Sequence, residues 1–285
     1  MPRTLTELVD AEAARLDAAG IESPRLAVEL FLRAILNMRA VDIVLNPSRL
    51  ISDEEEKTLA DMIERRLRHE PVQYIIGETE WFGLIFKCDA RALIPRPETE
   101  IVVERSLELL KGVGHPRIID VGTGTGCIAI ALAFHRPDAR VTAIDSSSGA
   151  LQLAEDNVAM HQLQERIELR QGDLLSPVPA NKPVDLVIAN LPYVRESEFP
   201  ELMPEVRDYE PRGALVAGGD GLESIRTLIA EAPELLAPGG HLVLEFGVDH
   251  DAAIRDLVAK TDGLEVVATI IDYNQRERGI IIRKT

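Results

Sequence analysis

Four consecutive residues, Asn190-Leu191-Pro192-Tyr193, have the most informative chemistry in this chain of 285 residues. They follow the apolar run 186–189, so the Asn190 side chain and the Leu191 carbonyl are expected at the end of a buried strand. Pro192 stiffens the turn and has no N–H, and Tyr193 offers a flat face on which a planar group can stack. We interpret the four residues as a catalytic site for a substrate with a planar –NH2, either an amide or an exocyclic ring amine.

The nitrogen of such a group is a weak nucleophile, because its lone pair is delocalised. Two acceptors that hold its two N–H groups fix the nitrogen and favour the pyramidal geometry in which the lone pair points at an electrophilic methyl group. Positioning of this kind can contribute roughly 7–11 kcal/mol, and preorganised acceptors contribute further. No strong base is needed before attack, since the proton can leave afterwards. The alternative interpretation is an ordinary turn at a strand end, which the same four residues would also form.

The stretch from Arg117 to Ala133 predicts a strand, a glycine-rich turn and a helix start. We expect free backbone N–H groups at this turn and close approach of a ligand. The glycine spacing does not match the dinucleotide fingerprint, and the turn follows an acid, Asp120, that would repel a pyrophosphate. A carboxylate suits a ligand with an ammonium group, which points to an amino-acid-like cofactor such as S-adenosylmethionine. Taken alone, such a turn could occur in any α/β protein.

Polar residues are expected at the ends of four successive strands, namely Asp120, Asp145, Asp173 and Asn190. Ligands of open α/β sheets bind beyond the carboxyl ends of the strands, so these side chains should converge on one rim. Asp145 is placed to accept hydrogen bonds from both hydroxyls of an adenosine ribose, with a helix N-cap as the alternative. Asp173 has two interpretations: it contacts the adenine amino group, or it forms a turn.

Residues 1–72 are predicted to form a helical bundle. A capping box between Thr4 and Glu7 marks the first helix, and Ser52 is the expected N-cap of the last. The predicted helices are 4–20, a second from Pro24 with Leu26, Leu30, Phe31 and Ile35 facing inward, 41–45, and a fourth from Ser52 to Pro71.

Residues 73–92 are predicted to form a β-hairpin linker, in which the strand-like run 73–89 is punctuated by glycines. Residues 93–285 are predicted to form an α/β domain, because strands and helices alternate from Arg117 onward. Pro97 is the expected first residue of a helix. The expected strands are 118–119, 141–144, 167–169, 186–189, 241–246, 264–271 and 279–282, of which the last two should pair as an antiparallel hairpin at a sheet edge.

Composition limits the classes of function. The formal net charge is −17, which disfavours a protein that grips a phosphate backbone and favours a protein partner. No apolar run approaches a membrane span, and the first residues lack the apolar core of a signal peptide, so cytoplasmic residence is expected. The two cysteines, Cys88 and Cys127, and six scattered histidines predict neither a disulfide nor a metal site.

The chain resembles the release-factor glutamine methyltransferases, the PrmC/HemK family, within the class I S-adenosylmethionine-dependent methyltransferases. The resemblance covers nearly the full length, and the segment from Ile94 to Glu100 is its most specific part. The matching motifs are Tyr74-Ile75-Ile76-Gly77, Phe82-Gly83, Ile94-Pro95-Arg96-Pro97-Glu98-Thr99-Glu100, Asp120 to Gly126, Asn190-Leu191-Pro192-Tyr193, Tyr209-Glu210-Pro211 and Ala214-Leu215.

The resemblance implies a Rossmann-like, mostly parallel seven-stranded sheet and N5-methylation of the glutamine in the Gly-Gly-Gln motif of peptide chain release factors. It also implies that the helical bundle helps to dock the release factor. The residues it assigns are Asp120, Gly122, Thr123, Gly124 and Gly126 to the methionyl part of the cofactor, Asp145 to the ribose, Asp173 and Leu174 to the adenine, and Asn190, the Leu191 carbonyl and Tyr193 to the glutamine amide.

One residue departs from the family pattern. The family has Asn-Pro-Pro-Tyr, whereas residue 191 here is leucine. The role at this position belongs to a backbone carbonyl, which leucine also supplies. Asn-Leu-Pro-Tyr also resembles the motif of ribosomal RNA adenine dimethylases, although those enzymes place their helical domain after the methyltransferase fold. N6-methylation of adenine in RNA or DNA is therefore the alternative function, and a catalytically silent protein-binding module is a third, which the intact cofactor rim disfavours.

Overall fold

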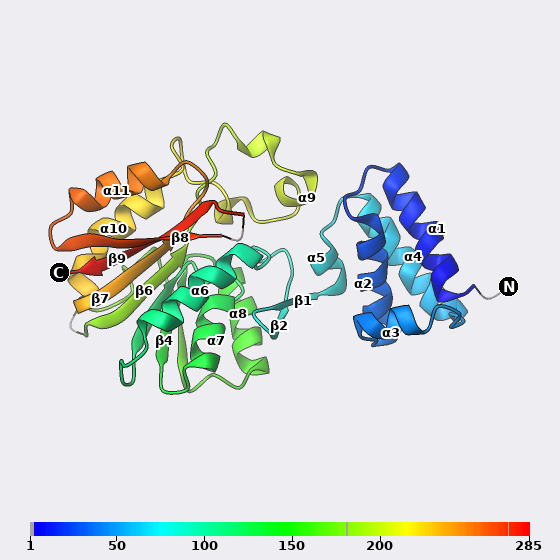
Figure 1. Cartoon of the computed structure of the whole chain (residues 1–285), viewed down its shortest axis with the longest axis horizontal. Coiled ribbons are helices and arrows are strands. Elements are labelled where there is room, and N and C mark those ends of the chain that lie inside the picture. The colour runs from blue at the N-terminus through cyan, green and yellow to red at the C-terminus, as the bar shows by residue number, and fades with distance from the viewer. Residues whose placement is uncertain (1–2, 181, 273) are drawn as a thin grey trace. The chain divides into compact units, whose positions relative to one another are not determined.

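The computed structural model of the chain describes residues 3–180, 182–272 and 274–285. The chain divides into two compact units (Figure 1). One consists of Met1–Glu78 and Met203–Tyr209, and the other of Thr79–Leu202 and Glu210–Thr285. The sequence-based segments 1–72, 73–92 and 93–285 stay a prediction of the domain organisation.

The first unit is helical. Its core contains Leu8, Phe31 and Ile63, each fully shielded from solvent. Tyr209, from the later segment of this unit, donates a hydrogen bond from its hydroxyl to the Arg68 carbonyl at 2.6 Å. The helices are α1 (Leu5–Ala18), α2 (Pro24–Leu36), α3 (Ala40–Leu45), α4 (Asp53–Leu67), α5 (Val72–Ile76) and, from the later segment, α9 (Pro204–Arg207).

The expected inward face of α2 is partly wrong. Leu26 is 54% exposed, whereas Val28, Phe31 and Leu32 are buried. These three residues are spaced by three and four, so they share one stripe of the helix, and a residue two positions before Val28 lies on the far side. The bulky Phe31 fixes which stripe faces the core, and Leu26 is left in solvent.

Both predicted N-caps are confirmed. Thr4 and Glu7 form a capping box at α1, and Ser52 and Glu55 form one at α4. We expect Ser52→Ala to lower the free energy of unfolding by about 1 kcal/mol, because the Glu55 N–H loses its acceptor, the Ser52 hydroxyl, while the N–H of residue 52 keeps the Glu55 carboxylate. Urea denaturation followed by circular dichroism measures this change. The control is Ser48→Ala, which alters an exposed serine outside the helices and should leave stability within about 0.5 kcal/mol; equal losses for both variants would contradict the capping role.

The predicted hairpin over 73–89 is wrong in its first part. Residues Val72–Ile76 form the short helix α5, which Gly77 ends with φ of +88°. The hairpin itself is shorter, with β1 at Glu78–Trp81 and β2 at Leu84–Lys87. The β-branched Ile75 suggested a strand, but a single helical turn is enough to bury it, and so short an element leaves no periodicity in the sequence.

The second unit contains a seven-stranded sheet in the order β5-β4-β3-β6-β7-β9-β8. The first five strands are parallel, and β9 pairs antiparallel with both β7 and β8, as the short final connection predicts. This confirms the predicted α/β class with a mostly parallel sheet. The strands are β3 (Arg117–Val121), β4 (Arg140–Asp145), β5 (Ile167–Gln171), β6 (Val184–Asn190), β7 (Leu236–Glu245), β8 (Leu264–Ile271) and β9 (Glu277–Lys284).

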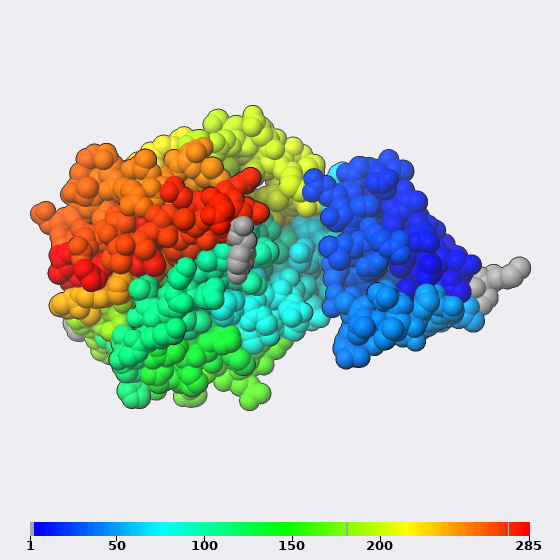
Figure 2. All heavy atoms as spheres, in the orientation of Figure 1, coloured from blue at the N-terminus to red at the C-terminus, as the bar shows by residue number. Residues whose placement is uncertain are grey.

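Helices cover both faces of this sheet (Figure 1). α6 (Pro97–Leu109), α7 (Cys127–His135) and α8 (Ser148–Met160) lie on one face, and α10 (Glu223–Leu235) and α11 (Asp251–Ala259) lie on the other. Two short 3₁₀ turns, η1 (Phe199–Glu201) and η2 (Arg212–Ala214), interrupt the long connection after β6. At the open edge, Val267 and Ile271 of β8 are 47% and 51% exposed, and this late part of the chain reaches the surface in Figure 2.

The start of β7 differs from the prediction. The strand begins at Leu236, not at His241, because Leu236 already pairs with Val184 of β6. The next paired residues are Leu186 and His241, so the intervening Pro-Gly-Gly segment forms an irregularity within the strand.

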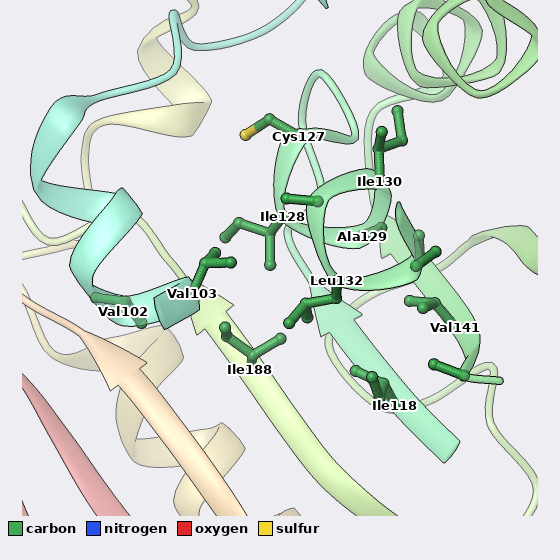
Figure 3. Close-up of a cluster of buried hydrophobic side chains, with 14 of the residues drawn as sticks. Val102, Val103, Ile118, Cys127, Ile128, Ala129, Ile130, Leu132, Val141 and Ile188 are labelled. Carbon is green, nitrogen blue, oxygen red and sulfur yellow. The ribbon is translucent and has the colours of Figure 1, made fainter. Parts of the chain in front are cut away.

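The helix that follows the glycine turn is apolar on every side and is therefore buried. All of Cys127–Ala133 is buried within α7. Figure 3 shows Ile128 and Leu132 facing Ile118 of β3 and Ile188 of β6, with Val103 of α6 beside them. This packing holds the start of α7, and hence the glycine turn, at the carboxyl end of β3.

Candidate active site

A cavity of about 340 Å³ lies at the carboxyl ends of the parallel strands of the second unit. Its volume falls within the ordinary range for a small-molecule site. Six stretches of chain supply its wall, all from that unit, and they include residues of each predicted strand end except Asp120. The lining residues are 91–96 with Thr99, 121–125 with Cys127 and Ile128, 144–147 with Ala150, 172–174, 190–192, and Pro211, Gly213, Ala214 and Ser224. Gly126, which was predicted to hold the cofactor, is not among them.

The glycine turn is built from left-handed residues. Gly122, Gly124 and Gly126 have φ of +73°, +55° and +81°, a region that side chains disfavour. The backbone N–H groups of Gly122 and Thr123 both donate to the Ile144 carbonyl, at 2.8 and 2.9 Å. The N–H of Gly124 donates to an Asp145 oxygen, and that of Gly126 to the Thr123 carbonyl. The expectation that this turn presents free N–H groups is therefore wrong for these four residues.

What the turn offers a ligand is acceptors. The carbonyl oxygens of Gly122 and Gly124 accept no backbone hydrogen bond from the described part of the chain. A turn whose donors are consumed and whose carbonyls remain open disfavours a phosphate and suits a group that donates, such as an ammonium. The sequence predicted an ammonium-bearing ligand from the Asp120 carboxylate, whereas at the cavity the open carbonyls of the turn are what favour such a ligand.

Asp120 lies beneath the turn and is not among the described residues that line the cavity. Its side chain has no exposed surface, and one oxygen accepts from the Thr123 hydroxyl at 2.7 Å and from the Ala129 N–H at 3.1 Å. The other oxygen has no partner among the described residues. Burial raises the pKa of Asp120 to about 7. Asp120 therefore stabilises the glycine turn, through Thr123, and the first turn of helix α7, through Ala129.

Gly122 is the glycine at which a side chain would interfere most directly with the site. A Cβ there would stand 3.2 Å from Leu191 Cδ2, on a backbone with positive φ. We expect Gly122→Ala to destabilise the protein by about 1–3 kcal/mol and to press on Leu191 at the cavity wall. Gly114→Ala is the matched control, because a Cβ at Gly114 meets nothing within 4 Å. Thermal unfolding of both variants measures the difference, and two equal melting temperatures would contradict the strain.

Asp145 ends β4 and lines the cavity. One of its oxygens accepts from the Gly124 N–H at 2.9 Å, and the other accepts from the Ser147 N–H at 2.9 Å. A carboxylate has about four acceptor positions, so each oxygen keeps capacity for one more donor. The N-cap of α8 is Ser147, whose side chain accepts from the Ala150 N–H, so the alternative N-cap role of Asp145 is not needed.

Asp173 and Leu174 follow β5 and also line the cavity. Asp173 is exposed, and Leu174 is half-buried with φ of +45°. A leucine seldom adopts this left-handed backbone. The Asp173 carbonyl accepts from the Ser176 N–H at 3.0 Å, which marks a turn. The structure therefore contains the turn and also places both residues at the cavity wall. Both interpretations of Asp173 remain, namely a turn-forming role and a contact with the adenine amino group.

Asn190 ends β6 and stands at the cavity with Leu191 and Pro192. Its amide nitrogen donates to the Thr99 hydroxyl oxygen at 3.1 Å, which leaves the amide oxygen for a ligand. The Leu191 side chain is buried over the glycine turn, and its carbonyl accepts no backbone hydrogen bond from the described residues. Two carbonyl oxygens from adjacent residues are thus available at one end of the cavity.

Tyr193 lies beside this wall and is not among the described residues that form it. Its ring packs edge-on to His250, with centroids 6.5 Å apart, and a Cβ at Gly247 would come within 2.8 Å of it. Burial raises the pKa of the Tyr193 hydroxyl to about 12. The structure therefore brings Asn190, Leu191 and Pro192 together at the cavity and leaves Tyr193 behind them.

Comparison with known proteins decides the family. A release factor glutamine methyltransferase from Nitratidesulfovibrio vulgaris is 39% identical to this chain, over 99% of this chain and 95% of its own length. One from Chlorobaculum tepidum is 40% identical, with 97% and 96% covered. The family model for the PrmC N-terminal domain matches residues 7–77, and that for the methyltransferase small domain matches residues 103–205. The chain belongs to the release factor glutamine methyltransferase family.

A solved structure supports the fold of this family member. The hMettl16 catalytic domain in complex with MAT2A 3′UTR hairpin 6 aligns with a TM-score of 0.59 and 17% identity, over 83% of this chain and 84% of that one. At this identity the likeness extends to the fold alone. Within the described residues, no helix combines the length and the apolar character that crossing a bilayer requires.

Sequence reasoning assigned no role to several residues that shape the site of this methyltransferase. Glu210 is 5% exposed; its carboxylate pairs with Arg96 at 2.5 Å and accepts from the Ile94 N–H at 3.1 Å. This pairing joins two stretches of the cavity wall that are more than a hundred positions apart. Thr99 was likewise missed, although it lies in the most specific segment of the family resemblance. One signal in the sequence could have identified both residues: each is a polar residue within a motif of the family resemblance to which no chemical role had been assigned.

The residues at the cavity fit S-adenosylmethionine. Open carbonyls at the glycine turn suit its ammonium group, and the spare acceptor positions of Asp145 suit the two ribose hydroxyls. The half-buried Leu174 offers an apolar surface for a ring. The glycine at 122 keeps the approach open, because a Cβ there would press on Leu191. The family and this fit together imply a methyl donor of this kind.

Proposed function

We propose that this protein transfers a methyl group from S-adenosylmethionine to the side-chain nitrogen N5 of the glutamine in the Gly-Gly-Gln motif of peptide chain release factors. The observation that carries the proposal is Asn190, whose amide nitrogen is held by Thr99 while its oxygen is left for a ligand at the cavity. The family of the chain supplies the substrate. The relatives from Nitratidesulfovibrio vulgaris and Chlorobaculum tepidum carry the name release factor glutamine methyltransferase.

In this proposal the cofactor supplies an electrophilic methyl group on a cationic sulfur. The carbonyls of Gly122 and Gly124 accept from its ammonium group, with Thr123 and Gly126 shaping the turn. Asp120 acts from beneath, where its carboxylate holds Thr123 and the start of α7. The Asp145 carboxylate accepts from the ribose hydroxyls, and Asp173 with Leu174 borders the adenine.

The substrate amide is held by two oxygens. The Asn190 side-chain oxygen and the Leu191 carbonyl each accept one N–H of the glutamine –NH2, which orients the nitrogen lone pair towards the methyl group. As the new N–C bond forms, the C–S bond breaks, its electron pair stays on sulfur, and the positive charge moves to the nitrogen. Preorganised acceptors stabilise that developing charge, and the proton then leaves to water. Pro192 stiffens the turn, and Tyr193, whose ring packs against His250, supports the turn from outside the cavity wall.

The partner and the setting follow from the same proposal. Release factors are the protein substrate, the helical segment 1–72 helps to dock them, and the methyltransferase domain occupies 93–285 beyond the linker 73–92. The enzyme acts in the cytoplasm. The net charge of −17 favours a protein partner over direct binding of nucleic acid.

The test uses the purified protein with labelled S-adenosylmethionine and, in separate reactions, a bacterial release factor or ribosomal RNA. Label in the release factor is the expected result. Label in RNA alone would overturn the proposal in favour of adenine N6-methylation, which the sequence Asn190-Leu191-Pro192-Tyr193 also resembles. Label in neither, with S-adenosylmethionine bound normally, would favour a silent binding module.

A further inference from the structure

Asn190 has a partner on the neighbouring strand that the proposed reaction does not use. In the β6–β7 ladder, Asn190 is paired with Glu245, the last residue of β7. Paired residues on adjacent strands direct their side chains to the same face of the sheet. Thr99, in the first turn of α6, packs on that face. Its hydroxyl oxygen accepts a hydrogen bond from the Asn190 amide nitrogen at 3.1 Å. The same hydroxyl lies close enough to the Glu245 carboxyl to lower the pKa of that group.

The polarity of this chain of groups is fixed by its buried end. A hydroxyl has one hydrogen to donate, and an ionised carboxylate can only accept. When Glu245 is ionised, the Thr99 hydroxyl donates its hydrogen to that carboxylate, and the Thr99 oxygen can then only accept from Asn190. It follows that the nitrogen of the Asn190 amide must face Thr99 and the oxygen must face away. Without this constraint the two ends of an amide are nearly equal in shape, and Asn190 could equally present its –NH2 to the substrate.

We propose that Thr99 and Glu245 are positioning residues that set the orientation of the Asn190 amide, so that its oxygen and not its nitrogen meets the substrate amide. This inference rests on the proposed function of Asn190 and deepens it. Neither residue needs to contact the substrate. Their effect is to disfavour the flipped orientation of the Asn190 amide. In that orientation the Asn190 –NH2 would face the substrate –NH2, and both groups are donors.

The surroundings show that this chain of groups is shielded from water. Thr99 and Glu245 are each 3% exposed, and Oε2 of Glu245 has no hydrogen-bond partner in the described part of the chain. Thr99 borders the cavity, but with so little of it exposed few water molecules can reach its hydroxyl and replace it as a partner of Asn190. If the Thr99 hydroxyl donated to Asn190 instead, the Asn190 amide would therefore keep the flipped orientation, with its oxygen towards Thr99 and its nitrogen towards the substrate.

The charge on Glu245 links this orientation to pH. The pKa of Glu245 is raised to about 7, chiefly by burial and to a smaller extent by Glu98. Thr99, Arg278 and Arg96 oppose this rise, and Tyr193 also lies near this carboxyl. Below that pKa the acid is neutral and its own O–H can donate to the Thr99 oxygen, so the Thr99 hydroxyl is free to donate to Asn190 instead. Both orientations of the Asn190 amide then become accessible. The turnover rate should therefore rise as pH increases through about 7.

The test compares variants by kcat on a release factor at saturating S-adenosylmethionine, with cofactor affinity measured by calorimetry. Thr99→Val keeps the shape and removes the hydroxyl, and we expect kcat to fall about 10- to 100-fold with cofactor affinity unchanged within about threefold. Thr99→Ser restores the hydroxyl and should recover kcat to within about threefold. Ser106→Ala is the matched control, because it removes a buried hydroxyl of the same helix that donates to the Val102 carbonyl of that helix, and it should leave kcat unchanged.

Glu245→Gln gives a second, independent readout. The neutral amide cannot titrate, so the rise of kcat through about pH 7 should disappear in this variant. Asp120, whose pKa is also raised to about 7, is present in both proteins, so the difference between the two pH profiles isolates Glu245. In the Asn190→Ala background, Thr99→Val should cost less than about twofold, since there is no amide left to orient.

Three results would overturn the inference: a Thr99→Val enzyme as active as wild type, a Thr99→Ser enzyme as poor as Thr99→Val, or an equal loss with and without Asn190. An unchanged pH profile in Glu245→Gln would remove Glu245 from the proposal. If wild type itself fails to methylate the release factor, the proposed function is wrong. That outcome is seen before any variant is compared, so the two failures are distinguishable.

Discussion

Replacing Asn190 with alanine is expected to lower kcat about 10²- to 10³-fold while cofactor affinity stays within a few-fold. In the proposed reaction the Asn190 oxygen is one of two acceptors for the substrate –NH2, and its effect would be greatest as the nitrogen becomes pyramidal and positively charged. An acceptor that acts mainly in the transition state changes kcat more than binding. Stopped-time assays with labelled S-adenosylmethionine measure kcat, and calorimetry measures cofactor binding.

The control for this prediction is Asn46→Ala, which removes an exposed asparagine that bonds a carbonyl within the helical unit. It should leave kcat unchanged. If Asn190→Ala proved as active as wild type, Asn190 would have no role as an acceptor. A loss confined to cofactor binding would instead make it a residue of the cofactor site.

Asp145→Ala is expected to weaken S-adenosylmethionine binding about 100-fold or more. Two hydrogen bonds from ribose hydroxyls to a charged acceptor would be lost, each worth roughly 1.5–3 kcal/mol. The Gly124 and Ser147 N–H groups would lose their acceptor as well, which loosens the glycine turn. Calorimetric titration of the purified variant gives the dissociation constant directly.

Glu155→Ala is a suitable control for Asp145→Ala, because Glu155 is exposed on α8, the helix that follows Asp145 in the chain. Its dissociation constant should match that of wild type. A wild-type constant for Asp145→Ala would remove the ribose role and leave Asp145 as a brace for the turn.

The sequence predicted most of the fold because strong local signals coincide with buried elements. Capping boxes located α1 and α4, and runs of β-branched residues located the strands that enter the core. α5 was missed because one helical turn has no periodicity to detect. The irregular start of β7 was missed because a Pro-Gly-Gly segment suggests a loop, whereas strand pairing with β6 resumes on both sides of it.

At the site, the sequence was enough to predict the residues that end strands, but not the residues that tertiary packing brings next to them. Asp145 and Asn190 were recognisable because strand ends in a parallel sheet meet at one rim. Thr99 and Glu245 were not, because their relation to Asn190 depends on how α6 crosses the sheet and on the register of β6 with β7. The donors of the glycine turn were misjudged for a related reason, since the neighbouring strand β4 supplies the acceptors that consume them.

These observations separate two tasks within one cavity. The glycine turn and Asp145 suit the methyl donor, and Asn190 with Leu191 suits the acceptor amide, and residues of both groups line the same cavity. Leu191 serves both, because its side chain covers Gly122 while its carbonyl remains open. A backbone carbonyl explains how leucine can stand where the family has proline without loss of the proposed chemistry.

The most direct test of the proposed reaction is tandem mass spectrometry of a release factor after incubation with the protein and S-adenosylmethionine. We predict one added methyl group, located on the side-chain nitrogen of the glutamine in the Gly-Gly-Gln motif, and none when that glutamine is replaced by glutamate. A methyl group on any other residue, or an unmodified release factor alongside methylated RNA, would contradict the account.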